Sequence, residues 1–342
     1  MKNKFILFFI LGPLLGLILG GGRIYYSLAI RKYQGPPVTF QIHSGETFSK
    51  INYRLGQEEI IGSTKVFHRY CQYKGYLTNF KTGIYEIPTG ITMLGVIELF
   101  QSGRGLLTSV TIPEGKNLYE IATILEENKV TSKDDFIEVA KDPAIAKELG
   151  LPGLSLEGYL YPETYSFAPQ SPAKSVAEAM VNVFKSKTNA LDFNSSPLNP
   201  KEVIILASLV EKETGAGFER PIIAGVFLNR LQKRMRLQSD PTTIYGIWER
   251  FNGNLRKSDL LEKTPYNTYK ISGLPVGPIA NPGISAIEAV LDPADHEFIY
   301  FVSKNDGTHV FSKTLVEHNR AVELWQKNQA NRKGRSWRDL NR

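Results

Sequence analysis

Two stretches of the chain share one pattern of apolar and polar positions. Residues 40–55 and 110–125 each begin with alternating apolar and polar side chains, which is the pattern of a half-buried strand. A glycine follows in each case, Gly45 or Gly115, and predicts a turn. Apolar residues spaced three and four apart come next and predict an amphipathic helix. The sequence therefore predicts two strand–turn–helix modules, with a further strand between them at residues 82–88.

A different pattern marks a helix that begins at residue 200. Asn199 suits the N-cap, Pro200 suits the first helical position, and Glu202 stands three residues after the cap. Residues 203–210 are apolar almost all round, so we expect most sides of this helix to be buried. The helix then ends in two glutamates, where a water-rich surface is the usual place for such side chains.

The two glutamates, Glu211 and Glu213, point in different directions. A helix turns by about 100° per residue, so they lie about 200° apart and cannot share one site. Glu213 falls on the stripe of Leu206 and Leu209, whose large side chains favour it as the drier carboxyl. A desolvated carboxyl has a raised pKa and can donate a proton near neutral pH. From the helix alone, two solvated charges at a helix end are an equally good interpretation.

Further helices are expected at residues 173–187 and 221–233, and a strand at residues 307–311, so the fold class is α+β. Turn-rich segments with tyrosine, amide and hydroxyl groups lie between these elements. Aromatic faces stack on sugar rings, and amide donors suit N-acetyl and hydroxyl groups. The candidates for holding a sugar are Gln238, Asp240, Tyr266 and Asn267. For Asp240, which precedes a proline, a helix-capping role is the stronger expectation.

The N-terminus has the pattern of a membrane anchor. Lys2 and Lys4 precede eighteen uncharged residues from Phe5 to Gly22, which is just enough to cross a bilayer. A basic start favours a cytoplasmic N-terminus and an exported body, and the glycines before Arg23 match a cleavage site poorly. We expect one retained transmembrane helix, followed by a linker.

Composition excludes several classes of site. The 342 residues are 42% hydrophobic, and 41 basic against 34 acidic residues give a net charge of +7, which suits anionic lipid or wall polymers as well as plain solubility. Neither zinc-finger spacing nor an RNA-binding signature is present, so nucleic acid is not an expected partner. Cys71 is the single cysteine, and the five histidines, His309 among them, lack metal-ligand spacing. No metal or cofactor is expected.

Several motifs occur together in a recognisable order. They are residues 156–162 (Leu-Glu-Gly-Tyr-Leu-Tyr-Pro), 207–214 (Ala-Ser-Leu-Val-Glu-Lys-Glu-Thr), 219–220 (Glu-Arg), 227–231 (Phe-Leu-Asn-Arg-Leu), 235–242 (Met-Arg-Leu-Gln-Ser-Asp-Pro-Thr), 266–269 (Tyr-Asn-Thr-Tyr) and 273–275 (Gly-Leu-Pro). With these motifs the chain resembles the endolytic murein transglycosylases, the YceG-like family. Ser239 varies the family's Leu-Gln-x-Asp-Pro-Thr pattern.

The resemblance implies a lytic transglycosylase that cleaves the N-acetylmuramic acid–β-1,4–N-acetylglucosamine bond without water. The products end in 1,6-anhydro-N-acetylmuramic acid, and the activity would terminate glycan elongation. The family's catalytic acid, the second glutamate of Glu-Lys-Glu-Thr, corresponds to Glu213. The implied organisation is an anchor and linker at residues 1–36, a small LysM-like α/β module at 37–108, a larger mixed α+β catalytic domain at 109–330 and a basic tail at 331–342.

The implied location is the cytoplasmic (inner) membrane, with a single span, the N-terminus inside and the catalytic body in the periplasm or extracytoplasmic space. Peptidoglycan glycan strands are the expected partner, the membrane is another, and peptidoglycan synthases are a candidate third. Two alternatives stay open. One is a hydrolytic muramidase that pairs Glu213 with Asp240 or Glu219, and the other is a non-enzymatic scaffold that binds the cell wall.

Overall fold

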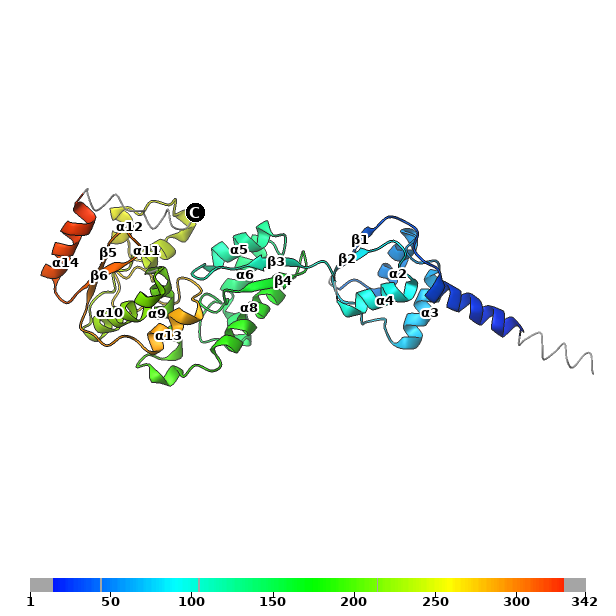
Figure 1. The fold of residues 1–342 in the computed structure, drawn as a ribbon, viewed down its shortest axis with the longest axis horizontal. Coiled ribbons are helices and arrows are strands. Elements are labelled where there is room, and N and C mark those ends of the chain that lie inside the picture. Colours follow the sequence, from blue (N-terminus) through cyan, green and yellow to red (C-terminus); the bar gives the residue numbers. More distant parts are fainter. Residues whose placement is uncertain (1–14, 44, 104, 214, 329–342) are drawn as a thin grey trace, which may run out of the picture. The chain divides into compact units, whose positions relative to one another are not determined.

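The structure is a computed structural model that describes residues 15–43, 45–103, 105–213 and 215–328 (Figure 1). It divides into two compact units. The smaller unit comprises residues 1–109 together with 166–171, and the larger comprises residues 110–165 and 172–342. The mixture of helices with short two-stranded sheets confirms the α+β class.

The smaller unit is built on an antiparallel strand pair with helices packed beside it. Its elements are η1 (Tyr26–Ile30), β1 (Val38–Ile42), α2 (Phe48–Gln57), α3 (Thr64–Lys74), β2 (Gly83–Ile87) and α4 (Met93–Ser102). Phe40 of β1 lies opposite Tyr85 of β2, and both side chains are fully buried. The ring of Phe40 stacks on Phe100 of α4, with centroids 5.5 Å apart. The alternation of residues 40–42 thus puts one face of the strand into an aromatic core. The likeness of residues 37–108 to a LysM module stays a prediction.

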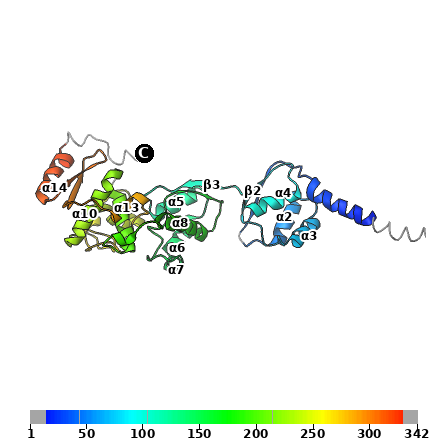
Figure 2. The ribbon, with the colours of Figure 1, turned by 60° about the horizontal axis from the view of Figure 1, so that its bottom comes forward.

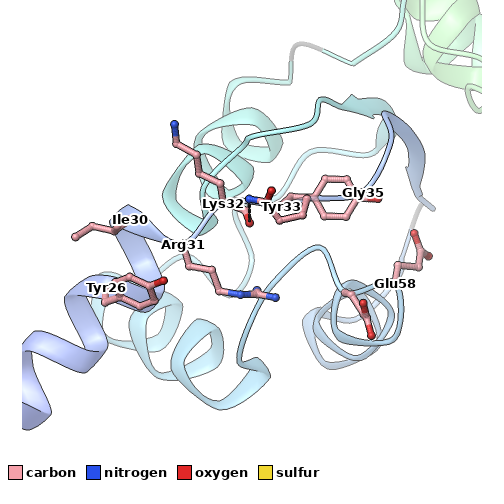
Figure 3. A pocket seen from close by; sticks show the side chains of 9 residues that line it. Tyr26, Ile30, Arg31, Lys32, Tyr33, Gly35 and Glu58 are labelled. Carbon is pink, nitrogen blue, oxygen red and sulfur yellow. Dashed lines mark hydrogen bonds between the residues drawn. The ribbon is translucent and has the colours of Figure 1, made fainter.

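The chain enters this unit through helical residues 15–25 and the π-helix η1. A hollow of about 470 Å³ lies at this entry, where Tyr26, Arg31, Lys32 and Glu58 line it (Figure 3). Residues 5–14 of the expected membrane span lie outside the described residues. Within the described part of the chain, no helix has both the length and the apolar character needed to cross a bilayer.

The larger unit holds most of the helices. Its elements are β3 (Thr108–Thr111, which begins at the boundary), α5 (Leu118–Glu127), α6 (Lys133–Lys141), α7 (Pro143–Glu148), β4 (Thr164–Phe167, which ends at the boundary), α8 (Ala173–Thr188), η2 (Phe193–Ser195), α9 (Pro200–Glu213), η3 (Gly217–Glu219), α10 (Arg220–Gln232), α11 (Asp240–Gly246), η4 (Trp248–Arg250), α12 (Lys257–Leu261), α13 (Ile284–Leu291), β5 (Tyr300–Ser303), β6 (His309–Ser312), α14 (Leu315–Val322) and η5 (Glu323–Lys327). β3 pairs with β4, and β5 pairs antiparallel with β6.

Helix α9 lies at the centre of this unit, where α10 and α13 pack against it (Figure 1). Helices α10 and α13 also contact each other and lie side by side in Figure 2. All eight side chains from Val203 to Val210 are buried, as their apolar pattern predicts. The predicted N-terminal cap is confirmed. Asn199 Oδ1 accepts from the Glu202 amide at 3.0 Å, and Glu202 Oε2 accepts from the Asn199 amide at 3.0 Å. This cap fixes the first turn of α9, and Glu211 and Glu213 lie in its last turn.

The turn of the second predicted module is attached to the far end of α9. Gly115 has φ of +74°, and a Cβ there would lie 3.4 Å from the Glu211 side chain. Lys212 Nζ donates to the Gly115 carbonyl at 3.0 Å, and the Gly115 amide donates to the Asn281 carbonyl at 3.0 Å. Residues 110–125 are therefore part of the larger unit, and their turn packs against the C-terminal end of α9.

Candidate active site

Glu213 is the last residue of α9 and is partly exposed. The buried hydroxyl of Ser239 donates to Glu213 Oε1 at 2.5 Å. Burial raises the pKa of Glu213 to about 7, and the negative charge of Asp240 adds to that rise. The Ser239 hydrogen bond and the positive charge of Arg230 act in the opposite direction. A carboxyl with this pKa is populated in both protonation states near neutral pH, which suits a group that first donates and then accepts a proton.

Arg230 of α10 is buried and held by backbone carbonyls rather than by a carboxylate. Its Nε donates to the Ile299 carbonyl at 2.6 Å, and its Nη1 donates to the Leu237 carbonyl at 2.8 Å. The guanidinium carbon also lies 5.3 Å from the centre of the Tyr300 ring. Arg230 thereby ties the segment before Ser239 to the strand β5, and it brings a fixed positive charge into the surroundings of Glu213.

Glu211 has entirely different partners. Its Oε1 lies 3.0 Å from Arg220 Nη2, and its Oε2 accepts from the Gly283 amide at 3.1 Å. The side chain is only 6% exposed. Glu114, in the turn beside Gly115, lies 3.7 Å from the same Arg220 nitrogen. Glu211 thus joins α9 to the start of α10 and to the loop before α13, and its oxygens are occupied by these contacts.

The segment that carries Gln238 and Asp240 differs in one respect from the sequence-based expectation. Ser239, not Asp240, is the N-cap residue of α11, and Asp240 is already helical. The capping expectation for Asp240 is wrong because its Oδ1 accepts from the Tyr269 hydroxyl at 2.7 Å. Pro241 does stand in the first turn, as expected. Both Gln238 and Asp240 are exposed, and Gln238 has φ of +51°.

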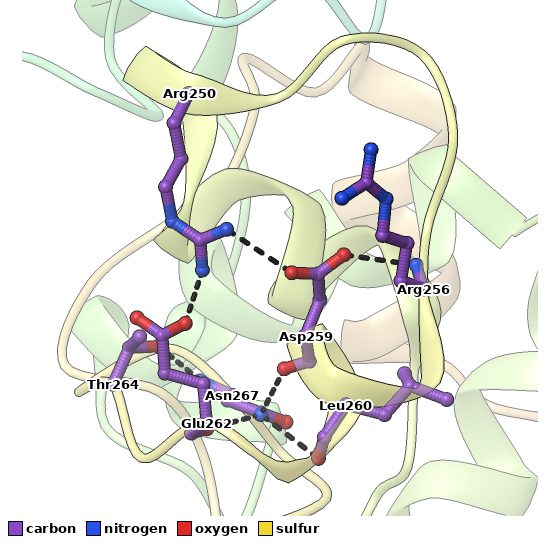
Figure 4. Close-up of polar contacts among 7 residues, drawn as sticks. All are labelled: Arg250, Arg256, Asp259, Leu260, Glu262, Thr264 and Asn267. Carbon is purple, nitrogen blue, oxygen red and sulfur yellow. Dashed lines mark hydrogen bonds and ion pairs between the residues drawn. The ribbon is translucent and has the colours of Figure 1, made fainter.

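Asn267 is fully buried and serves the loop that contains it (Figure 4). Its Nδ2 donates to the carbonyls of Glu262 at 2.6 Å and Leu260 at 3.2 Å, and its Oδ1 accepts from the Thr243 hydroxyl at 3.0 Å. The amide has no free surface for a ligand. The expectation that Asn267 contacts a sugar directly therefore does not fit its position, because these bonds saturate the group.

Tyr266, the residue before it, is half-buried. Its ring meets the ring of Tyr245 edge-on at 4.7 Å, and burial raises the pKa of its hydroxyl to about 12. Tyr245 in turn donates from its hydroxyl to Glu157 Oε2 at 2.8 Å. Of the four predicted sugar-holding residues, Gln238 and Asp240 flank the Ser239 that bonds Glu213, whereas Tyr266 belongs to an aromatic group on the other end of α11.

The chain is similar to several known proteins over most of its length. The model of the YceG-like family matches residues 40–324. The chain belongs to the YceG-like family. A Bacillus subtilis protein named endolytic murein transglycosylase is 35% identical over 333 residues, which cover 90% of this chain and 91% of that protein. A Streptococcus pneumoniae protein of the same name is 28% identical, and the match covers 90% of this chain but 63% of the pneumococcal protein. The crystal structure of a YceG-like protein from Listeria monocytogenes is 32% identical, with a TM-score of 0.57, and covers 83% of this chain and 98% of that one.

Within the family motifs, the structure reveals positions for which the sequence suggested no role. Glu157 is 1% exposed, and its carboxylate accepts from the Leu118 amide at 2.9 Å and from Asn281 Nδ2 at 2.7 Å. Burial raises the pKa of Glu157 to about 8, although these donors and the Tyr245 hydroxyl oppose that rise. The only hint in the sequence was a single glutamate in an aromatic and apolar run. Ser239 had no such hint, because a serine in a loop is ordinary.

Glu219, the alternative second carboxylate, is also engaged elsewhere. Its Oε2 lies 2.7 Å from His309 Nδ1, and its Oε1 accepts from the His309 amide at 2.9 Å. The pair joins η3 to β6, so His309 serves as a structural link between these two elements. Among the described residues, no group of three or more His, Cys, Asp or Glu side chains is arranged to hold a metal ion.

Proposed function

We propose that this protein is a peptidoglycan lytic transglycosylase in which Glu213 is the single acid–base group. The observation that carries the proposal is the contrast between this carboxyl, which is desolvated yet accessible, and its neighbours Glu211 and Glu219, whose oxygens are committed to structural contacts. The names of the Bacillus and Streptococcus relatives supply the substrate class.

The chemistry follows from the protonation states of Glu213. In its neutral form it donates its proton to the glycosidic oxygen as the bond from that oxygen to C1 breaks. The 2-acetamido group of the same sugar stabilises the positive charge that develops at C1. Glu213, now a carboxylate, takes the proton of the 6-hydroxyl while that oxygen bonds to C1. A 1,6-anhydro end and a free hydroxyl result, and water is neither consumed nor released.

The surrounding residues tune and position this group. Ser239 fixes the orientation of the carboxyl through its short hydrogen bond, while Asp240 and Arg230 act on its pKa in opposite directions. The exposure of Gln238 and Asp240 beside Ser239 supports a role for both in holding the sugar next to the cleaved bond. For Asn267, the contacts with Glu262 and Thr243 support a positioning role behind Tyr266.

Product analysis separates this reaction from hydrolysis. The soluble body should be incubated with defined uncrosslinked glycan strands, and the new ends should be weighed by mass spectrometry. Ends lighter by one water than reducing ends are expected. Reducing ends would instead establish a muramidase, in which a second carboxylate such as Asp240 activates water. A lack of any cleavage by the folded protein would favour the scaffold.

Membrane anchoring and the extracytoplasmic location also belong to this proposal. Residues 5–22 support it, as do Lys2 and Lys4 before them and Tyr25 and Tyr26 after them, because tyrosine side chains suit the interface beside a span, although Arg23, Arg31 and Lys32 on the outer side weaken the charge asymmetry. An enzyme anchored there would meet new glycan strands and terminate their elongation, next to peptidoglycan synthases. Protease added outside intact protoplasts should digest the body, and digestion only by protease on the cytoplasmic side would reject this location.

A further inference from the structure

A second hollow, of about 310 Å³, lies in the larger unit away from Glu213. It is formed by α5, the first residue of α6 and the 3-10 helix η4. It is lined by Lys116, Tyr119, Glu120, Thr123, Ile124, Lys133 and Trp248. None of these residues has a part in the reaction described above. Two aromatic rings, a hydroxyl, two ammonium groups and one carboxylate in the same hollow are the composition of a ligand site rather than of a core.

The rings of Tyr119 and Trp248 form a stacked aromatic pair in this hollow. Their centroids lie 6.0 Å apart, their planes differ by 15°, and both side chains are partly exposed. Aromatic side chains that only fill a core are covered on both faces. A partly exposed pair with nearly parallel planes suits the apolar face of a sugar ring.

The ammonium groups around this surface differ in their partners. Lys116 Nζ lies 2.7 Å from Glu120, and Lys141 Nζ lies 5.5 Å from the centre of the Tyr119 ring and 3.7 Å from Glu249. The backbone amide of Lys133 donates to Glu126 Oε1 at 3.0 Å, whereas its Nζ forms no ion pair with the described carboxylates. An ammonium group beside the aromatic pair, with no ion pair of its own, favours a ligand that brings a negative group.

An aromatic row connects the hollow to the candidate active site. Tyr119 lies 6.3 Å from Tyr245, and Tyr245 lies 4.7 Å from Tyr266, measured between ring centroids. Helix α11 runs from Asp240, next to the Ser239 that bonds Glu213, to the turn that carries Trp248. Seven helical residues span about 10 Å. One extended glycan strand can thus reach both places.

We propose that the hollow is a remote subsite for a muramic-acid unit of the glycan strand. The sugar ring packs against the exposed part of the Tyr119–Trp248 pair, and a carboxylate on the substituent of that sugar, either on its lactyl group or on its peptide stem, pairs with Lys133. This inference rests on the proposed function, because it takes the glycan as the ligand. Such a subsite fixes the register of the strand and so selects which bond meets Glu213.

Binding to catalytically inactive protein tests the subsite separately from catalysis. In a Glu213→Gln background, isothermal titration calorimetry should compare three ligands: peptide-bearing strands, strands stripped of peptide, and uncharged chitin oligosaccharides. Lys133→Gln should weaken binding of at least one carboxylate-bearing ligand about two- to fivefold, as expected for an exposed ion pair, and leave chitin oligosaccharides unaffected. A loss confined to peptide-bearing strands assigns the stem carboxylates, a loss confined to stripped strands assigns the lactyl group, and a loss on both assigns both.

Matched variants control these measurements. Lys201→Gln removes another partly exposed lysine from the first turn of a helix, α9, and should bind all three ligands as the parent does. Trp248→Ala should weaken all three ligands, whereas Trp248→Phe should keep most of the affinity because it keeps a ring. Equal binding by the Lys133→Gln and Lys201→Gln proteins on every ligand would overturn the subsite, as would normal binding by a folded Trp248→Ala protein. If active protein instead yields no anhydro ends while these binding differences persist, the proposed reaction fails and the subsite stands.

Discussion

Two sides of the same helical turn carry the two glutamates of α9, and they have opposite surroundings. On one side, Glu211 meets a guanidinium at 3.0 Å and a backbone amide at 3.1 Å, and is almost sealed from solvent. On the other side, Glu213 meets one hydroxyl at 2.5 Å and stays partly exposed. Charge compensation stabilises the first carboxylate, whereas desolvation without a paired cation raises the pKa of the second to about 7.

This difference supports the proposal that the two glutamates of the motif have separate roles, one structural and one catalytic. A buried carboxylate whose oxygens are engaged by an ion pair and an amide donor is suited to holding loops together. A carboxyl without a paired cation can change its protonation state at little cost near pH 7. The following variants test that division, in order of decreasing effect.

The largest effect is expected from Glu213→Gln. General acid–base catalysis is typically worth about 10²–10⁴-fold, so the rate of glycan cleavage should fall at least that far because the amide cannot donate a proton in this way. The thermal unfolding midpoint should stay near that of the parent protein. Near-normal cleavage by this variant would reject Glu213 as the acid. A variant that is inactive yet supports the normal cellular role would favour the scaffold.

Glu211→Gln should have the reverse effect, with a loss of stability and little loss of activity. It removes the charge that pairs with Arg220 and should lower the free energy of unfolding by about 1–3 kcal/mol, the usual cost of leaving a buried polar partner unsatisfied. Glycan cleavage at a temperature where the variant is folded should fall far less than in Glu213→Gln. Urea unfolding and product formation, measured on the same preparation, check both parts. An inactive Glu211→Gln protein of normal stability would mean that the roles within the pair are exchanged.

The pH dependence of glycan cleavage tests the contacts of Glu213. Because the neutral form of Glu213 starts the reaction, kcat/KM should decline as pH rises through about 7. In Ser239→Ala, the lost hydrogen bond had favoured the carboxylate, so the pKa should rise and the decline should move to higher pH. A hydrogen bond of about 0.5–1.5 kcal/mol corresponds to a shift of up to about one unit. A shift to lower pH would contradict the assigned contact.

Asp240→Asn should move the same profile in the opposite direction and by less. The negative charge of Asp240 raises the pKa of Glu213, so its removal lowers that pKa and the decline begins at lower pH. The Tyr269→Phe variant is a control that removes the hydroxyl donor to Asp240 but keeps the charge. An unchanged pH profile in Asp240→Asn, alongside a raised KM, would restrict Asp240 to sugar binding.

Local patterns along the chain determined much of the framework. The period of the apolar residues placed β1, α2, α5 and α9, and Asn199 with Glu202 specified where α9 begins, because these features depend on neighbours a few residues away. The run of motifs also determined the family. Asp240 was misjudged as a cap because its competing partner, Tyr269, lies 29 residues away in the sequence.

The sequence favoured Glu213 through its leucine stripe and through the family motif, but only the tertiary structure showed the different contacts of the two glutamates. Every residue from Val203 to Val210 is buried, so the stripes behind Glu211 and Glu213 are equally dry and helical position alone does not distinguish them. The contacts that distinguish them come from other segments of the chain. Arg220 and Gly283 contact Glu211, whereas Ser239 contacts Glu213. The charge state of a carboxyl depends on what lies within a few ångströms of it, and chain folding brings together residues that no local pattern relates.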